Sequence, residues 1–240
     1  MPEPSILTPE FTVTLNSIDP LSPTVKRFML ACTDRNYQRE AGQWIRLARE
    51  IDGEVHANSF SVVSAPHPAG HIELAIKAST RQPLIRWLHE SAQPGDQLTV
   101  SNGQGSFYYR DGMGTRVVLL AAGTGITPFV SILRYIAQEV PQAEATLVYS
   151  IASRDECLYC ELLRQLCDQQ RLRFLPTLTQ PDINWQGRTG RIDIELLQQT
   201  GLDPHTLYYL CGPQEMVDDI STLLLQHGIP ERQVIFEKWW

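Results

Sequence analysis

Short runs of alternating hydrophobic and polar residues occupy the first half of the chain and predict β-strands. Turn-forming pairs such as Asp19-Pro20, Asp52-Gly53 and Pro94-Gly95 separate them. Strands are expected over residues 12–18, 25–30, 44–48, 60–64, 72–76 and 97–100, with one helix at about residues 84–90. Many short strands with a single helix are typical of a small antiparallel β-barrel.

The pattern changes after about residue 112. Residues 117–121 form a continuous apolar run, as expected of a strand that is buried on both faces. Helices and strands then alternate, with further strands expected at 146–150, 173–178, 206–210 and 233–236 and helices at 154–169, 192–199 and from 128 and 214. This alternation predicts a doubly wound sheet of five parallel strands that binds ligands at the carboxyl ends of its strands. We therefore expect an N-terminal β-barrel domain over residues 1–112 and an α/β nucleotide-binding domain over residues 113–240.

Length, net charge and cysteine content exclude several classes of protein. The length of 240 residues fits two modest domains, and the formal net charge of -7 argues against nucleic acid or an anionic membrane as a partner. The longest uncharged apolar stretch, residues 117–133, is broken by glycine and proline and is short for a bilayer span. Five cysteines do not make a secreted disulfide framework, and the first residues do not resemble a signal peptide. These features predict a cytoplasmic protein.

A glycine-rich turn, Gly123-Thr124-Gly125-Ile126-Thr127-Pro128, directly follows the first predicted parallel strand. Glycine lets the backbone turn tightly and approach a ligand closely. Thr127 is expected to cap the next helix, and Pro128 to occupy its first position. The free N–H groups and positive end of such a helix suit a pyrophosphate, although turns of this kind are also often purely structural.

A second turn, Cys211-Gly212-Pro213, ends the fourth predicted parallel strand. Because the carboxyl ends of parallel strands meet at one edge, a single extended ligand could contact both turns. The alternative is a simple strand-ending turn with a small buried thiol.

Two further segments stand out, Asn58–Pro66 in the barrel half and the terminal Phe236-Glu-Lys-Trp-Trp240. Two tryptophans at a chain end are unusual. They either stack on a flat aromatic ligand or fill the space between the two domains.

Taken together and in this order, the FSVVSAP segment, the GTGITP turn, the Cys-Gly-Pro turn and the aromatic end resemble the ferredoxin–NADP reductase family of flavoproteins over nearly the whole chain. In more detail, the chain is similar to the members named for an oxidoreductase NAD-binding domain. The resemblance implies FAD in the barrel and NADPH or NADH on the α/β domain. It implies hydride transfer from nicotinamide to flavin, and then electron transfer to an external acceptor such as ferredoxin or another redox protein.

Roles on the flavin side follow from the same resemblance. Ser61 matches the serine that hydrogen-bonds the flavin near N5, and Phe60 matches an aromatic residue packed beside the ring, usually a tyrosine. Glu237 matches an acidic residue near the chain end. Trp239, followed by Trp240, matches the aromatic residue that covers the flavin and must yield to the nicotinamide.

On the nucleotide side, Gly123, Thr124, Gly125 and Thr127, with Pro128, match the phosphate loop. Cys211 matches the cysteine near nicotinamide C4, followed by Gly212 and Pro213 in the same turn. The resemblance thus implies Ser61, Cys211 and Glu237 as catalytic residues and the other residues as cofactor ligands, with no metal.

Two positions depart from the family pattern. Asn58 stands where an arginine usually neutralises the flavin pyrophosphate, and Ile85 or Arg86 stands where a small hydroxyl residue is usual. We expect Arg81 or Arg86 to replace the missing charge, because charge-to-phosphate hydrogen bonds are strong. Lys77 is a further candidate cofactor ligand.

The choice between the two nicotinamide cofactors depends on Ser153 and Arg154, which follow the second parallel strand. Arg154 could meet the 2′-phosphate of NADPH. Ser153 and Glu156 also have the spacing of a capping box, which needs no ligand. The pattern slightly favours NADPH over NADH.

Two other groups of residues receive structural interpretations. Cys157, Cys160 and Cys167 fall on one side of a predicted helix and are expected to pack as small buried residues. A metal or redox role is the alternative. A run of six basic residues between Lys26 and Arg49 is expected to be a solvated face. Its alternative is a docking patch, including Arg35 and Arg39, for an acidic carrier protein.

The sequence therefore predicts an FAD-dependent NAD(P)H oxidoreductase. Two alternatives stay open, an NAD(P)H-dependent reductase of free flavin and a redox-inactive nucleotide-binding regulatory module.

Overall fold

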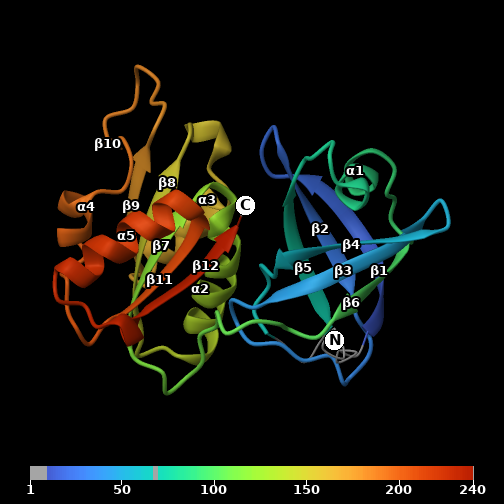
Figure 1. Ribbon diagram of the computed structural model, residues 1–240, viewed down its shortest axis with the longest axis horizontal. Helices are drawn as coiled ribbons and strands as arrows, with labels where there is room; N and C mark the ends of the chain where they lie inside the picture. The colour runs from blue at the N-terminus through green and yellow to red at the C-terminus, as the bar shows by residue number, and fades with distance from the viewer. Residues whose placement is uncertain (1–9, 67–69, 240) are drawn as a thin grey trace, which may run out of the picture.

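A computed structural model describes residues 10–66 and 70–239 of the chain, and it contains two halves side by side (Figure 1). The first half is a curled antiparallel sheet with the strand order β4-β3-β6-β1-β2-β5. Its elements are β1 (Glu10–Pro20), β2 (Val25–Ala31), β3 (Trp44–Ile51), β4 (Glu54–Ser61), β5 (His71–Lys77), α1 (Pro83–Glu90) and β6 (Gln97–Ser101). Alternate side chains such as Val13, Leu15, Phe28 and Leu30 fill its interior, as strand geometry requires. The expected barrel is confirmed.

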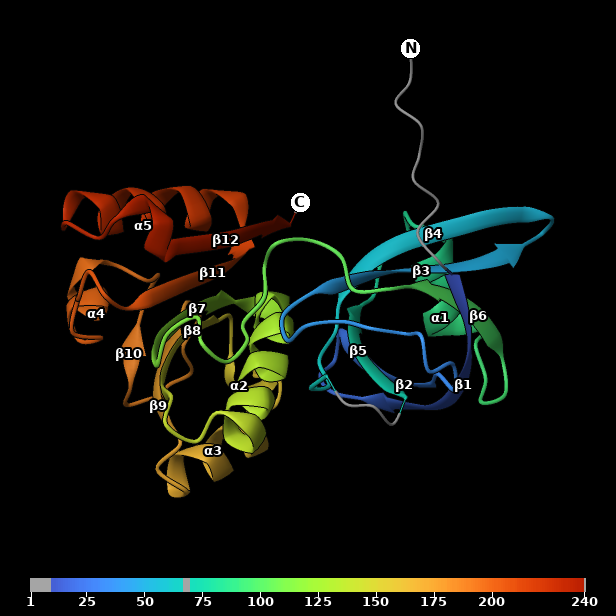
Figure 2. The same cartoon turned by 90° about the horizontal axis from the view of Figure 1, so that it is seen from below.

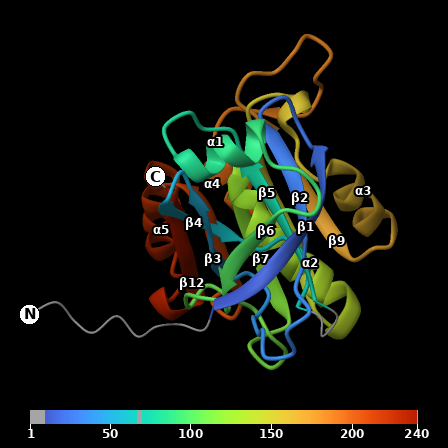
Figure 3. The same ribbon diagram turned by 90° about the vertical axis from the view of Figure 1, so that its right-hand side faces the viewer.

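The two edge strands of the curled sheet, β4 and β5, are not paired with each other by regular β-sheet hydrogen bonds. One backbone hydrogen bond links them just beyond β4, from Val63 N–H to Glu73 O at 2.8 Å. Helix α1 lies across one end of the curled sheet and buries Leu84, Ile85 and Leu88 (Figure 3). A gap between the edge strands thus remains beside α1.

One predicted strand was misplaced. Residues 60–64 were expected to be extended, but β4 ends at Ser61 and begins at Glu54. Asp52 and Gly53 form the tight turn, both with positive φ, and β4 pairs with β3 from there onward. Most β4 side chains are exposed or half-buried, so the strand lacks the apolar signal that sequence patterns rely on.

The second half is a parallel sheet with the order β10-β9-β8-β7-β11-β12. Its strands are β7 (Arg116–Ala122), β8 (Glu144–Ile151), β9 (Leu172–Leu178), β10 (Arg188–Thr189), β11 (Leu207–Pro213) and β12 (Val234–Trp239). Its helices are α2 (Thr127–Glu139), α3 (Cys160–Asp168), α4 (Ile194–Gln198) and α5 (Gln214–Gln226), with short 3₁₀ turns η1 (Gly123–Ile126), η2 (Arg154–Glu156) and η3 (Glu231–Gln233). The doubly wound sheet is confirmed, with the two-residue β10 added to the five expected strands.

Both faces of this sheet are covered. In β7, Val117, Leu119 and Ala121 belong to the core under α2 and α3, whereas Val118 and Leu120 belong to the core under α4 and α5. Figure 2 shows the helices on opposite faces of the sheet, with α2 between the sheet and the barrel. Burial on both faces explains the continuous apolar run in the sequence.

Two details of the helices differ from expectation. Thr127 does not cap α2, because it is the first helical residue and its hydroxyl donates back to Thr124 O at 2.9 Å. The helix expected over 154–169 begins only at Cys160, because Tyr159 before it has a left-handed φ of 58°. Cys157 and Cys160 form a disulfide, so the expectation that they pack as buried thiols is wrong.

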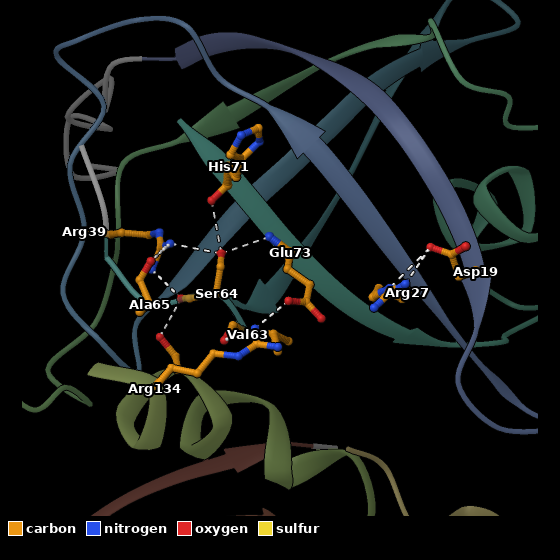
Figure 4. Close-up of polar contacts among 10 residues, drawn as sticks. Asp19, Arg27, Arg39, Val63, Ser64, Ala65, His71, Glu73 and Arg134 are labelled. Atoms are coloured by element: carbon orange, nitrogen blue, oxygen red, sulfur yellow. Dashed lines mark hydrogen bonds and ion pairs between the residues drawn. The ribbon is translucent and has the colours of Figure 1, made fainter. Parts of the chain in front are cut away.

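The domains are joined by polar contacts from α2. Ser131 Oγ donates to Ser64 O at 2.8 Å, and Arg134 donates to Val63 O and pairs with the buried Glu73 (Figure 4). Glu73 is only 5% exposed, so this ion pair lies within the domain interface.

A second contact joins the domains through η2. The Glu156 carboxylate accepts hydrogen bonds from the hydroxyls of Ser22 and Thr24, both at 3.2 Å. We call the contacts of Ser131, Arg134 and Glu156 with the barrel the seam.

Most basic side chains of the run from Lys26 to Arg49 bind partners within the barrel half. Arg39 donates to Ser64 and to the carbonyl oxygen of Ala65 (Figure 4). Lys26, Arg27, Arg46 and Arg49 bind His89 O, Asp19, Glu10 and Asp96 respectively. Of this run, Arg35 alone makes no side-chain hydrogen bond or ion pair with the described residues. A docking patch that needs Arg39 is therefore not supported.

Within the described part of the chain, none of the helices combines the length and the hydrophobicity that a bilayer crossing would need.

Candidate active site

A cavity of about 430 Å³ opens at the gap between the edge strands of the barrel. Strand β4 contributes Ala57–Ser61, β5 contributes Ala75–Lys77, and α1 contributes Ile85 with the preceding Gln82. Thr124 and Thr127 of the α/β domain complete the lining. The volume is within the range of small-molecule sites, and both domains build the cavity.

The predicted catalytic residues converge beside this cavity. Ser61, 6% exposed at the end of β4, donates from its hydroxyl to a Glu237 carboxylate oxygen at 3.4 Å. Glu237 lies opposite Cys211 in the parallel register of β12 and β11. Residues separated by 176 positions in the chain are therefore in contact across the domain boundary.

The predicted phosphate loop, residues 123–128, lies against the same strand ends. A Cβ atom on Gly125 would stand 2.2 Å from Cys211 O and 2.6 Å from its carbonyl carbon, so only glycine permits this approach. Gly123 has a left-handed φ of 53°, and its carbonyl accepts a hydrogen bond from the Tyr149 hydroxyl at 2.9 Å. Burial raises the pKa of Tyr149, so this hydroxyl stays a neutral donor. The loop is thus held rigidly at the carboxyl edge of the sheet.

A second cavity, of about 280 Å³, lies on the other side of the loop. Gly123 and Pro213 line it together with the ends of β8 and β9 and the beginning of α5. Ser150, Thr179 and Arg191 also line it and were not identified from the sequence. Ser150 and Thr179 lie at or just after strand ends, which is the signal that could have found them.

The two cavities lie on either side of the first loop residues. Gly123 lines the second cavity and the adjacent Thr124 lines the first. Ser61 lines the first cavity, and Pro213, two residues after the buried Cys211, lines the second. A larger hollow of about 700 Å³ lies at the opposite edge, where β7, β8 and β9 begin, away from these residues.

Cations near the first cavity differ in their placement. Lys77 lines it, whereas Arg81 and Arg86 are exposed and are not among the lining residues. Asn58 and Phe60 line it as expected. Among the described residues that line this cavity, Lys77 is the one that carries a charge.

Arg154 lies at the start of η2 and does not line the second cavity. Its guanidinium is 3.2 Å from Asp182 and lies over the Trp185 ring at 5.5 Å from the ring centroid. The expected capping box is not formed, because Ser153 makes no side-chain cap and Glu156 instead binds the barrel.

The remaining predicted residues lie at the same strand ends. Pro128 is buried in the first turn of α2, and a Cβ on Gly212 would meet Met216 at 2.7 Å. The backbone of Trp239 pairs with Pro213 at the end of β12 (its side chain is not described). Trp240 lies outside the described residues.

Two family models match this chain. Residues 12–109 match the oxidoreductase FAD-binding domain family, and residues 119–222 match the oxidoreductase NAD-binding domain family. The chain is 33% identical over 241 residues to the oxidoreductase NAD-binding domain-containing protein 1 of Danio rerio, covering 91% of this chain and 88% of that protein.

Two other similarities concern reductases. The reductase component of phenol 2-monooxygenase from Pseudomonas sp. (strain CF600) is 28% identical, with 92% of this chain and 63% of that protein covered. A solved ferredoxin–NADP⁺ reductase from Neisseria gonorrhoeae with bound FAD and NADP has a TM-score of 0.82 and 26% identity, covering 96% of this chain and 99% of that one.

Proposed function

Because the chain belongs to the ferredoxin–NADP reductase-like superfamily of flavoproteins, we propose that it takes hydride from NADPH and delivers electrons to a separate electron-carrier protein. The chain is an NAD(P)H-dependent flavin oxidoreductase with FAD- and NAD-binding domains. The observation that carries the proposal is the pair of cavities that adjoin at Gly123 and Thr124, with Ser61, Cys211 and Glu237 beside them.

The residues of the first cavity suit a flavin ring. The half-buried Phe60 offers an apolar surface, and the hydroxyl of Ser61 is a polar group at the inner end. FAD, when bound there, supplies a ring that accepts hydride from the nicotinamide. Such transfer requires the reacting atoms within roughly 3–3.5 Å, so the rigid placement of both cavities is what the protein contributes.

The three converging side chains then have distinct tasks. Glu237 accepts the Ser61 hydroxyl hydrogen and so orients the oxygen toward the cavity. Cys211 is fully buried, and its backbone fixes the position of Gly125. We assign Cys211 the role of shaping the nicotinamide site rather than that of a nucleophile.

Lys77 is the side chain we propose for the flavin pyrophosphate, in place of Arg81 or Arg86. It lines the cavity close to Gln82 and the first N–H groups of α1, which are suited to an anion. Lys77→Gln should release FAD during purification, whereas Arg86→Gln on the exposed face of α1 should retain it. The ratio of flavin to protein absorbance measures both, and the reverse result would reassign the phosphate to Arg86.

We propose NADPH as the preferred donor. Arg154, whose side chain is 45% exposed, could exchange Asp182 for a 2′-phosphate. Arg154→Ala should lower kcat/KM for NADPH by about tenfold and leave that for NADH nearly unchanged, as expected from the loss of one charged hydrogen bond. Equal losses with both nucleotides would refute this assignment.

The acceptor is proposed to be a separate protein because a relative is named as the reductase component of a monooxygenase. Anaerobic NADPH should bleach the flavin of the purified protein, and a one-electron carrier protein should restore its colour. A protein that binds FAD and NADPH without bleaching would overturn the proposal.

One observation favours a second candidate, the reduction of free flavin. Lys77 is the sole charge among the described lining residues, so the hold on FAD is expected to be weak. A colourless protein that oxidises NADPH only when free flavin is added would select this candidate.

A further inference from the structure

The segment Cys157-Leu158-Tyr159-Cys160 lies at the N-terminus of α3, and the proposed function does not use it. The two cysteines form a disulfide with a Cα–Cα distance of 5.8 Å, well within the range that disulfides adopt. Both are partly exposed, so a small thiol reagent can reach them.

We propose that Cys157 and Cys160 are a reversible dithiol–disulfide couple that exchanges with small disulfides such as glutathione disulfide and controls the seam. Cys160 is the first residue of α3, where the helix dipole favours a thiolate. A Cys-x-x-Cys spacing at a helix start is the arrangement in which one thiol attacks and the other resolves.

Two other cysteines provide a contrast within the same chain. Burial raises the pKa of both Cys32 and Cys167 above the ordinary thiol value. Each therefore stays a protonated thiol, which is a poor nucleophile.

The oxidation of the cysteine pair by glutathione disulfide takes place in two steps. The thiolate of one cysteine attacks glutathione disulfide, which forms a mixed disulfide and releases one glutathione thiolate. The second cysteine, as its thiolate, attacks the mixed disulfide, closes the Cys157–Cys160 bond and releases the second glutathione. Two electrons pass from the cysteine pair to glutathione disulfide, and excess glutathione reverses the reaction.

The residues enclosed by the disulfide reach the other domain. Leu158 is 1% exposed, and Tyr159 holds a left-handed backbone that costs about 1 kcal/mol for a residue with a Cβ. The Tyr159 ring lies 5.7 Å from the Arg134 guanidinium, which pairs with Glu73 of the barrel.

The residue before the disulfide also contacts the barrel, since Glu156 binds Ser22 and Thr24. The disulfide therefore restrains a segment in which both Tyr159, between the two cysteines, and Glu156, just before them, lie at the seam. Reduction removes the restraint on Tyr159, and we expect the seam to loosen.

The exchange is tested on the folded protein in buffers with different ratios of reduced to oxidised glutathione. Alkylation followed by peptide mass spectrometry should show a disulfide at low ratios and two thiols at high ratios for Cys157 and Cys160, with Cys32 and Cys167 remaining thiols. Cys157→Ser, which removes the resolving thiol, should trap glutathione on Cys160, whereas Cys167→Ser should trap none. A pair that changes state only after denaturation, or that never takes up glutathione, would overturn the proposal.

The link to the seam is tested by amide hydrogen exchange on the oxidised and the reduced wild type. Reduction should speed exchange by about fivefold in residues 22–25 and 158–163, the scale of a modest coupling energy, and leave β7 unchanged. Cys157→Ser/Cys160→Ser should match the reduced protein. Identical exchange in both forms would refute the control of the seam. Neither readout depends on the proposed function, so the two proposals fail separately.

Discussion

The two sides of the domain interface are built differently. At the seam, one ion pair and several hydrogen bonds from α2 and η2 join the two domains. On the side of the first cavity, a volume of about 430 Å³ stays open, and Ser61 and Glu237 make a polar contact of 3.4 Å between the domains.

Helix α2 connects the two sides. Its first residue, Thr127, lines the cavity, and Arg134, about two turns later, belongs to the seam. The orientation of the domains is thus set by groups that take no part in the chemistry. This leaves the polar groups of the cavity available for ligands, and it means that the seam and the cavity can be perturbed separately.

The largest effect should come from breaking the seam. Arg134→Met leaves the carboxylate of the 5% exposed Glu73 without its cation, and should lower the free energy of unfolding by about 3 kcal/mol. Arg164→Met removes the exposed pair with Glu161 and should cost about 0.5 kcal/mol or less. Urea denaturation measures both variants, and equal stabilities would show that the seam does not hold the domains.

The next effect should come from the phosphate loop. Gly125→Ala places a Cβ 2.2 Å from Cys211 O, so the loop must move away from the strand end. Because a displacement of about 1 Å can cost about 100-fold in rate, flavin reduction by NADPH in a stopped-flow experiment should slow by about that factor. Gly201, far from the loop in sequence, has a φ of 71°, and a Cβ added there meets no atom within 4 Å. Gly201→Ala should lower stability slightly and leave the rate unchanged; an equal loss of rate would mean that general destabilisation, not the clash at Cys211 O, is responsible.

A smaller effect is expected at the open cavity itself. Ser61→Ala removes a hydroxyl that lines the cavity and donates to Glu237, without altering the seam. It should slow flavin reduction by about tenfold, less than the roughly 100-fold or more expected for a lost transition-state donor, because the hydroxyl hydrogen already bonds Glu237. The KM for NADPH should stay nearly constant, because Ser61 lies on the flavin side. Ser17→Ala, at a hydroxyl that bonds Asp19 far from the cavity, is the matched control. An unchanged rate in Ser61→Ala would remove Ser61 from the catalytic set.

Sequence patterns identified the turns and strand ends that border the two cavities. The doubly wound sheet followed from the alternation of helices and apolar strands, and the glycine turn stood out because it directly follows the first of these strands. The structure adds the reason for Gly125, which is its close approach to Cys211 O. Ser61 and Glu237 were named only from the resemblance to a family, and their contact was not predicted, since no local rule relates residues 176 positions apart.

The seam was not predicted. Glu73 and Arg134 have no distinctive neighbours in the sequence, and their burial results from the packing of one domain on the other. Strand β4 was misplaced for a related reason, because its residues are mostly exposed and are ordered by pairing with β3. The disulfide was missed because a helix was assumed where Tyr159 takes a left-handed conformation.

The smallest effect concerns the edge strand β5 and its response to acid. The His89 ring lies 3.0 Å from Ile76 O beside the cavity, and burial lowers the pKa of His89 below its ordinary value of 6.5. The unfolded chain therefore binds this proton more readily, so the stabilisation is complete above about pH 6.5 and is lost as the pH falls toward the lower pKa of the folded state. His89→Gln should flatten the decline in the free energy of unfolding between about pH 7 and about pH 5, whereas the exposed His205→Gln should leave it unchanged. If the free energy of unfolding of His89→Gln falls as steeply with pH as that of the wild type, the acid sensitivity arises elsewhere. The contact of His89 with β5 is then not its source.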